Sequence, residues 1–470
     1  MMDIKGPTTY SKVTHQFLAI FCANIISLSH GCSLGWLSPY LPLLQSDSSP
    51  LFTGSINLEE TSWIGAILCV GGVVGNSVFG YLCKLIGRKR SITLLAIPNL
   101  GFWLCIMFGH YVYHLYFARF LIGCTGGGLF VCVPLFVAEI AEDRIRGTLG
   151  SLLLVCSNVG ILFSFVAGCY VSYEIFPYVM IVFPLIFLFS FYFLPETPQY
   201  LLQQDKVKEA EIALRFYRNS NNFDSKEACE KFDMEMAKIK QLSKQNNDSE
   251  KFKFADLKTP AARKGILIGV TLMAINQFSG CFTLLNYSAT IFRDSGSDIS
   301  PNMSSIIIAS IQCIGTYVAT ILVDKVGRKL LLTTSASATS IGLAVMGAYT
   351  YLDKLKFDLH NFNWVPVCSL SFVMLIASIG ILPLPFIVLV EVLPKNIREI
   401  GSTLCVSSIS VTSFLILKTF PILTNVIGLH GCMWLFSGAC TFGTLFIIFV
   451  VEETKGASLD PVKSRCMSIY

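Results

Sequence analysis

The sequence predicts an all-α membrane protein, with twelve transmembrane helices in two six-helix bundles and a cytoplasmic helical linker between them. Hydrophobic residues make up 53% of the 470 residues and charged residues only 14%, whereas soluble domains carry about 25% charged residues. Twelve stretches are apolar and long enough to cross a bilayer, and one long polar segment divides them into six and six. The chain is therefore expected to fold in lipid.

The twelve spans follow from length and apolarity, because a bilayer core about 30 Å thick takes roughly 20 residues per helix. Before the polar segment we expect spans at 16–44, 61–82, 91–109, 113–136, 148–172 and 176–194. After it we expect spans at 265–292, 302–323, 330–349, 364–390, 401–425 and 429–451. The predicted domains are a first bundle at 1–194, a linker with surface helices at 195–264, and a second bundle with a short tail at 265–470.

The cations predict the orientation of the chain. Of the 35 Lys and Arg residues, 30 lie in one alternating set of segments, and 14 of these are in the linker. The other set holds only Arg293, Lys354 and Lys356. Since cytoplasmic loops carry the excess of positive charge, we expect both termini in the cytoplasm. The sequon at Asn302, followed by Met303 and Ser304, then lies on the outer side as a candidate glycosylation site.

Three motifs recur in the same order in both halves, which indicates parallel repeats. Gly87-Arg88-Lys89 follows the second span and Gly327-Arg328-Lys329 follows the eighth. Each half also has a Glu seven residues before an Arg at the end of a span, Glu139 with Arg146 and Glu391 with Arg398. A Thr preceded by Glu follows the sixth and the twelfth span.

These charges predict a cytoplasmic latch in each half, in which the Arg of the Gly-Arg-Lys turn pairs with the Glu. Such a latch would hold one state of an alternating-access cycle; the alternative is that the cations only set topology. Asp324 completes the set in the second half, whereas Lys84 stands at that position in the first, so the first latch is expected to be weaker. The predicted gating charges are Arg88, Lys89, Glu139, Arg146, Asp324, Arg328, Lys329, Glu391 and Arg398.

Helix breaks mark a candidate binding site near the bilayer midplane. Gly280 weakens the seventh span, and Pro383 and Pro385 interrupt the tenth, because proline cannot donate a helical hydrogen bond. Breaks at corresponding positions of two repeats indicate a substrate site. The buried amides nearby need partners, either a neutral hydroxyl-rich ligand or a neighbouring helix; they are Asn276, Gln277, Asn286 and Gln312.

The distribution of other reactive groups excludes several classes of protein. No Asp or Glu lies near the middle of a span, and a proton-driven carrier usually needs such a group, so we expect uncoupled transport. Arg119 and Lys418 are the embedded cations. No phosphate-binding loop is present, which argues against an ATP-driven pump. Most of the 17 Cys lie inside apolar runs without paired spacing or His companions, so neither disulfides nor metal ligands are expected of them. No cofactor and no enzymatic activity are expected.

Taken together, the motifs resemble those of the sugar porters of the major facilitator superfamily over nearly the whole chain. The first-half motifs are Gly87-Arg88-Lys89, Arg119-Phe-Leu-Ile-Gly123, Glu139 with Arg146-Gly147, and Pro195-Glu196-Thr197-Pro198. The second half has Gln277-Phe-Ser279-Gly280, Asp324-Lys-Val-Gly327-Arg328-Lys329, Pro383-Leu-Pro385, Glu391 with Arg398, and Glu453-Thr454-Lys455-Gly456. Within the family, Gly147-Thr-Leu-Gly150, Asn158-Val-Gly-Ile-Leu162, Phe165-Val-Ala-Gly168 and Lys418-Thr-Phe420 look most like insect facilitated trehalose transporters.

The resemblance implies facilitated diffusion of trehalose or a hexose across the plasma membrane, with sugar and lipid as partners, no nucleic acid, and a monomeric chain. It adds Asn158 and Phe386 to the candidate substrate-binding residues, the latter in place of the family's tryptophan. The family's glutamine pair reads Asn276-Gln277 here, and Asn286 replaces the first member of an aromatic pair. Because these changes gather at the sugar contacts, a non-transporting sugar sensor and a carrier of another polyol or small organic solute remain alternatives.

Overall fold

A computed structural model describes residues 13–142, 144–219, 230, 232–241, 254–296, 299–394 and 397–453. The side chains of Asp324 and Arg398, two of the predicted gating charges, lie outside the described part, as do both chain termini. Every element of the described residues is helical, as predicted from composition and apolar run length.

The first half of the molecule comprises helices α1 to α9 and forms six spans. Its helices are α1 (Thr14–Gly35), α2 (Leu37–Leu44), α3 (Leu58–Leu85), α4 (Arg88–Leu94), α5 (Ala96–Phe108), α6 (Val112–Ile140), α7 (Arg146–Tyr170), α8 (Phe176–Met180) and α9 (Val182–Tyr192). Three pairs, α1 with α2, α4 with α5 and α8 with α9, each form one span with a short irregularity. The span Phe176–Tyr192 is the shortest of the six.

The second half comprises helices α13 to α19 and forms the other six spans. Its helices are α13 (Pro260–Phe278), α14 (Cys281–Asp294), α15 (Pro301–Val326), α16 (Arg328–Lys354), α17 (Val365–Ile379), α18 (Leu384–Val392) and α19 (Arg398–Val450). The last of these contains two spans, because Gly428 has a φ of 79° and turns the chain back. The twelve predicted spans are confirmed.

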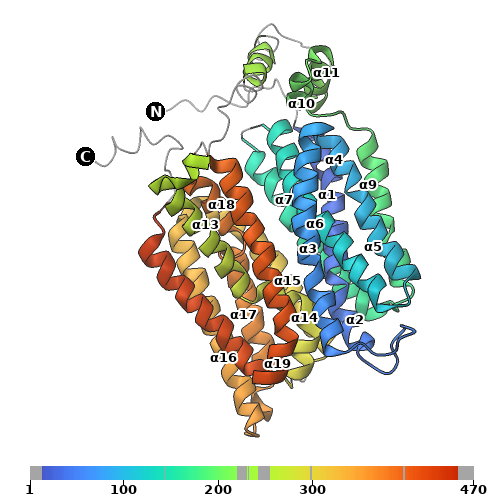
Figure 1. Cartoon of the computed structure of the whole chain (residues 1–470), viewed down its shortest axis with the longest axis vertical. Helices are drawn as coiled ribbons and strands as arrows, with labels where there is room; N and C mark the ends of the chain where they lie inside the picture. Colours follow the sequence, from blue (N-terminus) through green and yellow to red (C-terminus); the bar gives the residue numbers. More distant parts are fainter. Residues whose placement is uncertain are drawn as a thin grey trace.

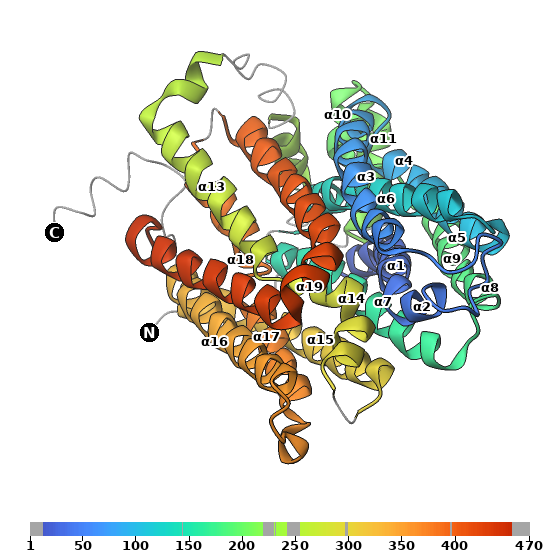
Figure 2. The ribbon, with the colours of Figure 1, turned by 60° about the horizontal axis from the view of Figure 1, so that its bottom comes forward.

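The two halves lie side by side and are clearly distinct in Figure 1. Within each half the helices pack on one another, and between the halves α3 packs on α19, α7 on α15, and α2 on α14. The halves separate toward one end, where α10 (Pro198–Gln203) and α11 (Val207–Tyr217) lie, and meet at the opposite end (Figures 1 and 2). We call these the linker end and the far end.

Part of the linker is anchored to the first half at the linker end. Arg218 donates from Nη1 to the carbonyl oxygen of Ile140 at 2.8 Å, and Tyr217 donates to the carbonyl oxygen of Pro195 at 2.6 Å. Arg218 also pairs with Glu235 at 2.6 Å. Surface helices in this segment, expected from its charge pattern, are therefore present and fixed to the bundle by buried polar contacts.

Small residues allow the helices of the first half to pack closely. On α3 and α6, a Cβ added to Gly71 would meet the carbonyl of Phe120, and one added to Gly123 would meet that of Leu68. Van der Waals contact between backbones is the main source of helix association in lipid, where burying apolar surface brings no hydrophobic gain. The glycine-rich sequence of α6 is therefore explained by packing as well as by helix flexibility.

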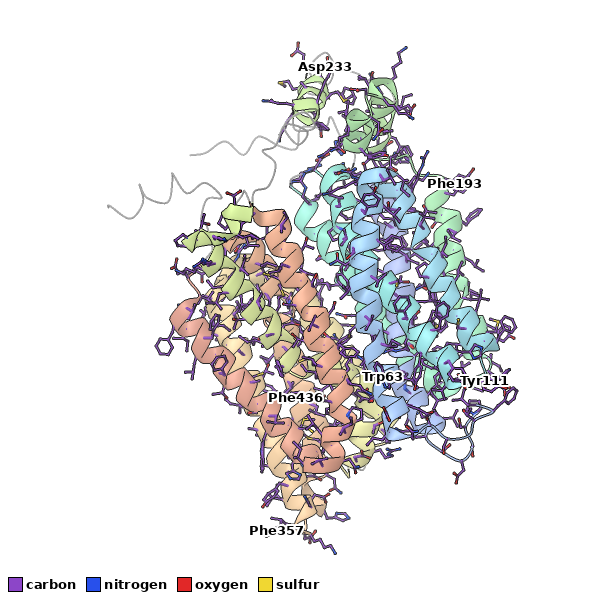
Figure 3. The ribbon with its side chains drawn as sticks, viewed as in Figure 1. Trp63, Tyr111, Phe193, Asp233, Phe357 and Phe436 are labelled. Atoms are coloured by element: carbon purple, nitrogen blue, oxygen red, sulfur yellow. The ribbon has the colours of Figure 1, made fainter. Side chains whose placement is uncertain are left out.

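Large apolar side chains cover the outside of both halves. Tyr170 and Phe449 are about four-fifths exposed in the protein alone, at 81% and 80%. Tyr111 and Phe193 project outward near opposite ends of the first half (Figure 3), as aromatic residues do at the two interfaces of a bilayer. Such a surface requires lipid around it, so the protein is a multi-pass membrane protein.

Candidate functional site

Both predicted helix breaks are present in the second half. Gly280 separates α13 from α14 with a φ of 76°, a left-handed conformation that suits glycine. The helix α17 ends at Ile379, and α18 begins after Pro383. The breaks leave backbone carbonyls without their helical donors, and these groups must find partners inside the membrane.

Asn276 supplies the missing donor at the second break. Its Nδ2 donates to the carbonyl oxygens of Ile381 at 2.8 Å and Leu382 at 3.1 Å. The helical partner of Ile381 would be the N–H of residue 385, which is a proline and has none. Asn276 is 4% exposed. The amide therefore joins the two broken spans to each other, which favours the interhelical alternative for this residue.

The other three amides differ in their hydrogen bonding. Gln277 donates from Nε2 to Oδ1 of Asn276 at 2.8 Å. Asn158 on α7 donates to the hydroxyl of Thr316 on α15 at 2.8 Å, a hydrogen bond between the halves. Gln312, one turn before Thr316, is 5% exposed, and its buried Oε1 has no hydrogen-bond partner among the described residues. Such an acceptor costs free energy until a donor reaches it.

Asn286 takes part in a second contact between the halves. Its Oδ1 accepts from Nη2 of Arg119 on α6 at 2.8 Å, and its Nδ2 donates to the carbonyl of Phe282 at 2.9 Å. Arg119 is fully buried, donates from Nε to the carbonyl of Ile64 at 3.0 Å, and has no described partner at Nη1. The embedded arginine thus bridges the halves through neutral acceptors.

Phe386 differs from these amides in its exposure. Its side chain is 38% exposed on α18, so it is available to a ligand or to lipid and does not pack in the core. The structure also contains a buried histidine, His30, that was not among the predicted site residues. His30 on α1 is 3% exposed, and its Nδ1 has no partner among the residues that the structure describes. A lone histidine inside an apolar run is the signal for it in the sequence.

At the linker end of the first half, the predicted pairing of Arg88 with Glu139 is present. Nη2 of Arg88 lies 2.7 Å from Oε1 of Glu139, and both side chains are less than a tenth exposed. Glu196 accepts from the backbone N–H groups of Arg88 at 3.0 Å and Lys89 at 2.9 Å. Lys89 Nζ donates to the carbonyl of Tyr192 at 2.8 Å.

The second half repeats this arrangement contact by contact. Glu453 accepts from the backbone N–H groups of Arg328 at 2.9 Å and Lys329 at 3.1 Å. Lys329 Nζ donates to the carbonyl of Ile448 at 2.8 Å, and Nε of Arg328 lies 3.4 Å from Oε1 of Glu391. The repeat inferred from sequence is therefore a repeat of structure as well.

Two features of the charge clusters differ from expectation. The Arg88–Glu139 contact in the first half is shorter and more buried than the Arg328–Glu391 contact in the second, where the side chains are 15% and 23% exposed. The presence of Lys84 in place of an aspartate therefore does not weaken the pairing in the first half. Each described contact also joins spans of one half only. Arg146 donates to the carbonyl of Ala141 at 3.2 Å, again within the first half. The contacts described for the clusters therefore hold each half together.

The glycine of each Gly-Arg-Lys turn is required by the backbone. Gly87 and Gly327 have φ angles of 101° and 103°, and an added Cβ would press on the carboxylates of Glu196 and Glu453. We predict that Gly87→Ala destabilises the protein by on the order of 1–3 kcal/mol, measured by thermal unfolding in detergent. Gly150→Ala, where an added Cβ meets nothing within 4 Å, is the control; an equal loss there would contradict the prediction.

The candidate glycosylation site has an unfavourable geometry. Asn302 is in the first turn of α15, and Ser304, the third residue of the sequon, is fully buried. Modification needs an accessible sequon on a surface segment. We predict that Asn302→Gln leaves the electrophoretic mobility unchanged in cells that glycosylate. A faster-migrating variant, or a shift on endoglycosidase treatment of the wild type, would contradict this.

Two six-helix halves that meet through polar contacts, with broken helices beside them, are the architecture of a membrane transporter. A family model described as "Sugar (and other) transporter" matches residues 19–464. The chain belongs to this family, whose members are transporters and not enzymes.

The individual comparisons agree with this assignment. A protein named facilitated trehalose transporter Tret1 from Bombyx mori is 32% identical over 474 residues, which cover 99% of this chain and 91% of that protein. A protein of the same name from Polypedilum vanderplanki is 30% identical over 471 residues, with the same coverage. Among solved structures, a partially occluded inward-open conformation of the xylose transporter XylE from E. coli has a TM-score of 0.78 at 20% identity, covering 95% of this chain and all of that chain.

Proposed function

We propose that the protein carries trehalose, or a hexose, across the plasma membrane by facilitated diffusion. In this proposal residues 1–194 and 265–470 are the two moving units and residues 195–264 connect them. The linker end and both termini face the cytoplasm, which the distribution of Lys and Arg supports. The protein acts as a monomer and binds no nucleic acid. The names of the relatives from Bombyx mori and Polypedilum vanderplanki support trehalose as the first sugar to test.

One observation carries the proposal, the buried Oε1 of Gln312 without a donor. It lies one turn from the Asn158–Thr316 hydrogen bond that joins the halves. A sugar hydroxyl entering between α7 and α15 would satisfy this acceptor and would separate or replace the bond between the halves. Binding and movement of the halves are thereby coupled, as alternating access requires.

The polar groups also support uncoupled transport. The buried Arg119 has the neutral side chain of Asn286 as its partner across the interface, and no Asp or Glu lies near the middle of a span. Proton-coupled transport usually needs a carboxylate on the pathway that gains and loses a proton. Because no span has such a carboxylate near its middle, we infer that sugar movement is not coupled to the proton gradient.

The test is uptake of labelled trehalose and glucose by oocytes that express the chain, with Gln312→Leu beside the wild type. Loss of one hydrogen bond is expected to raise the half-saturating concentration by about two- to tenfold, while Thr334→Val, at an exposed position on α16, leaves it unchanged. Absence of saturable uptake despite surface expression would favour a sensor. Uptake that follows the proton gradient would contradict the uncoupled mechanism, and His30 would then be the first residue to substitute.

A further inference from the structure

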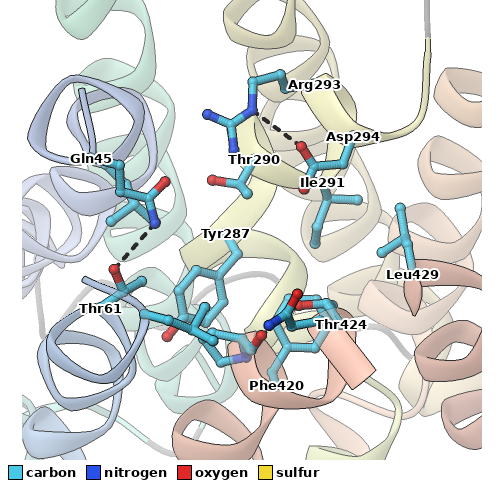
Figure 4. Close-up of a pocket in the computed structure, with 14 residues that line it drawn as sticks. Gln45, Thr61, Tyr287, Thr290, Ile291, Arg293, Asp294, Phe420, Thr424 and Leu429 are labelled. Carbon is cyan, nitrogen blue, oxygen red and sulfur yellow. Dashed lines mark hydrogen bonds and ion pairs between the residues drawn. The ribbon is translucent and has the colours of Figure 1, made fainter. Parts of the chain in front are cut away.

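A pocket of about 330 Å³ lies between the halves at the far end, away from the amides described above. It is formed by α2 and α3 of the first half and by α14 and α19 of the second (Figure 4). None of the six candidate substrate-binding residues lines it. Its volume is within the range of about 300–1,000 Å³ that is usual for small-molecule sites.

The lining of the pocket combines apolar side chains with several polar groups, and its charges are balanced. Gln45 and Thr61, joined by a hydrogen bond of 3.1 Å, bring an amide and a hydroxyl from the first half. Thr424 brings a hydroxyl from α19. Arg293 and Asp294, the charged residues at the rim, pair with each other at 3.1 Å. A pocket of this kind favours a neutral ligand with several hydroxyl groups over an ion.

Two further features indicate a ligand. Thr290 is a residue of the pocket wall, and its Oγ1 is buried with no hydrogen-bond partner in the described part of the chain. The rings of Tyr287 and Phe420, which also line the pocket, stack with their centroids 5.4 Å apart. The electron-rich face of an aromatic ring attracts the weakly positive C–H groups of an apolar sugar face. An unsatisfied hydroxyl beside aromatic rings suits a carbohydrate.

The pocket is separated from the interior by residues that connect the halves. The Tyr287 hydroxyl donates to the carbonyl of Leu417 at 3.2 Å, and the same hydroxyl lies against Gly65 of the first half, where a Cβ has no room. The preceding residue, Asn286, is bonded to Arg119. A ligand in the pocket and a ligand at Gln312 would therefore occupy different sites in this conformation.

We propose that this far-end pocket is a second binding site, which holds a neutral mono- or disaccharide while the pathway beneath it is closed. The inference rests on the proposed function, because it takes the ligand class from it. With the far end facing outward, the site would bind a sugar from the outer solution before the halves separate at that end. Its occupancy does not depend on the site at Gln312.

The test is the binding stoichiometry of labelled trehalose and glucose, measured by equilibrium dialysis on the purified full-length protein in nanodiscs. The wild type is expected to bind two sugars per chain and Thr424→Phe, which fills the pocket, only one. Thr419→Phe is the control, because Thr419 is exposed on the same helix and, like Thr424, donates its hydroxyl to a carbonyl of its own turn. Thr290→Val, close in shape to the wild type, is expected to weaken one of the two binding events by about two- to tenfold.

The outcomes separate this inference from the proposed function. One sugar bound by the wild type and retained in Thr424→Phe would overturn the second site and leave the transport proposal in place. One sugar bound by the wild type and lost in Thr424→Phe would support the far-end site and count against the site at Gln312. Equal effects of Thr424→Phe and Thr419→Phe, or no saturable binding of either sugar, would overturn the inference.

Discussion

Glu139→Ala is expected to destabilise the protein by about 3–5 kcal/mol, because it leaves the guanidinium of Arg88 buried without its carboxylate. Arg88 is 6% exposed and lies 2.7 Å from Glu139. Removing one member of a buried ion pair costs more than the pair contributes, since the remaining charge is still desolvated. The measurement is thermal or denaturant unfolding of the purified protein in detergent.

The second half offers a matched control for this prediction. Glu391→Ala removes the corresponding carboxylate, but Arg328 lies 3.4 Å away and both side chains are more exposed than in the first half. Water screens this pair, so we expect a loss of only about 1 kcal/mol. Equal losses from the two substitutions would show that the difference in geometry between the halves has no energetic consequence.

Asn286→Leu is expected to shift the protein toward the conformation that is open at the far end. The hydrogen bond from Arg119 to Asn286 crosses between the halves, so it exists only while they meet there. A hydrogen bond to a charged group contributes about 1.5–3 kcal/mol, which corresponds to a change of roughly 10- to 150-fold in the equilibrium. Distances between spin labels at the far ends of α3 and α19 would report the shift.

Lys418→Met is the comparison for this second prediction. Lys418 also crosses between the halves, donating to the Ser62 hydroxyl at 2.8 Å and lying 4.1 Å from the ring of Trp63. Its side chain is half-buried, whereas Arg119 is fully buried. Solvent can replace its partner, so a smaller shift is expected. An unchanged distance distribution in Asn286→Leu would contradict the role assigned to the Arg119–Asn286 contact.

Sequence reasoning was most effective for contacts that are short-range or duplicated. The pairing of Arg88 with Glu139 and of Arg328 with Glu391 was inferred from motifs that recur in both halves, and both pairs are present. The breaks around Gly280 and Pro383 followed from the backbone preferences of glycine and proline. The breaks depend on local backbone chemistry and the pairs on a motif that occurs twice, and a sequence displays both directly.

The roles of the buried amides could not be predicted from the sequence. Asn276 and Gln312 look equivalent in the sequence, since each is an amide in an apolar run near a break or an interface. In the structure Asn276 donates to the carbonyls of Ile381 and Leu382 at the break, while Gln312 has an acceptor without a partner among the described residues. The difference arises from which helix lies opposite each side chain, and no local pattern encodes that.

The amino-acid sequence by itself determined that this protein is embedded in a membrane, crosses it twelve times and consists of two related halves. Apolar run length, charge asymmetry and repeated motifs are properties of the chain alone, so no tertiary structure is needed to see them. Only the tertiary structure decided that Arg88 and Glu139, and Arg328 and Glu391, pair within one half, that Arg119 meets Asn286 across the interface, and that a pocket lies at the far end. Those features depend on how helices distant in sequence are brought together, and helix packing selects the partners from many chemically equivalent candidates.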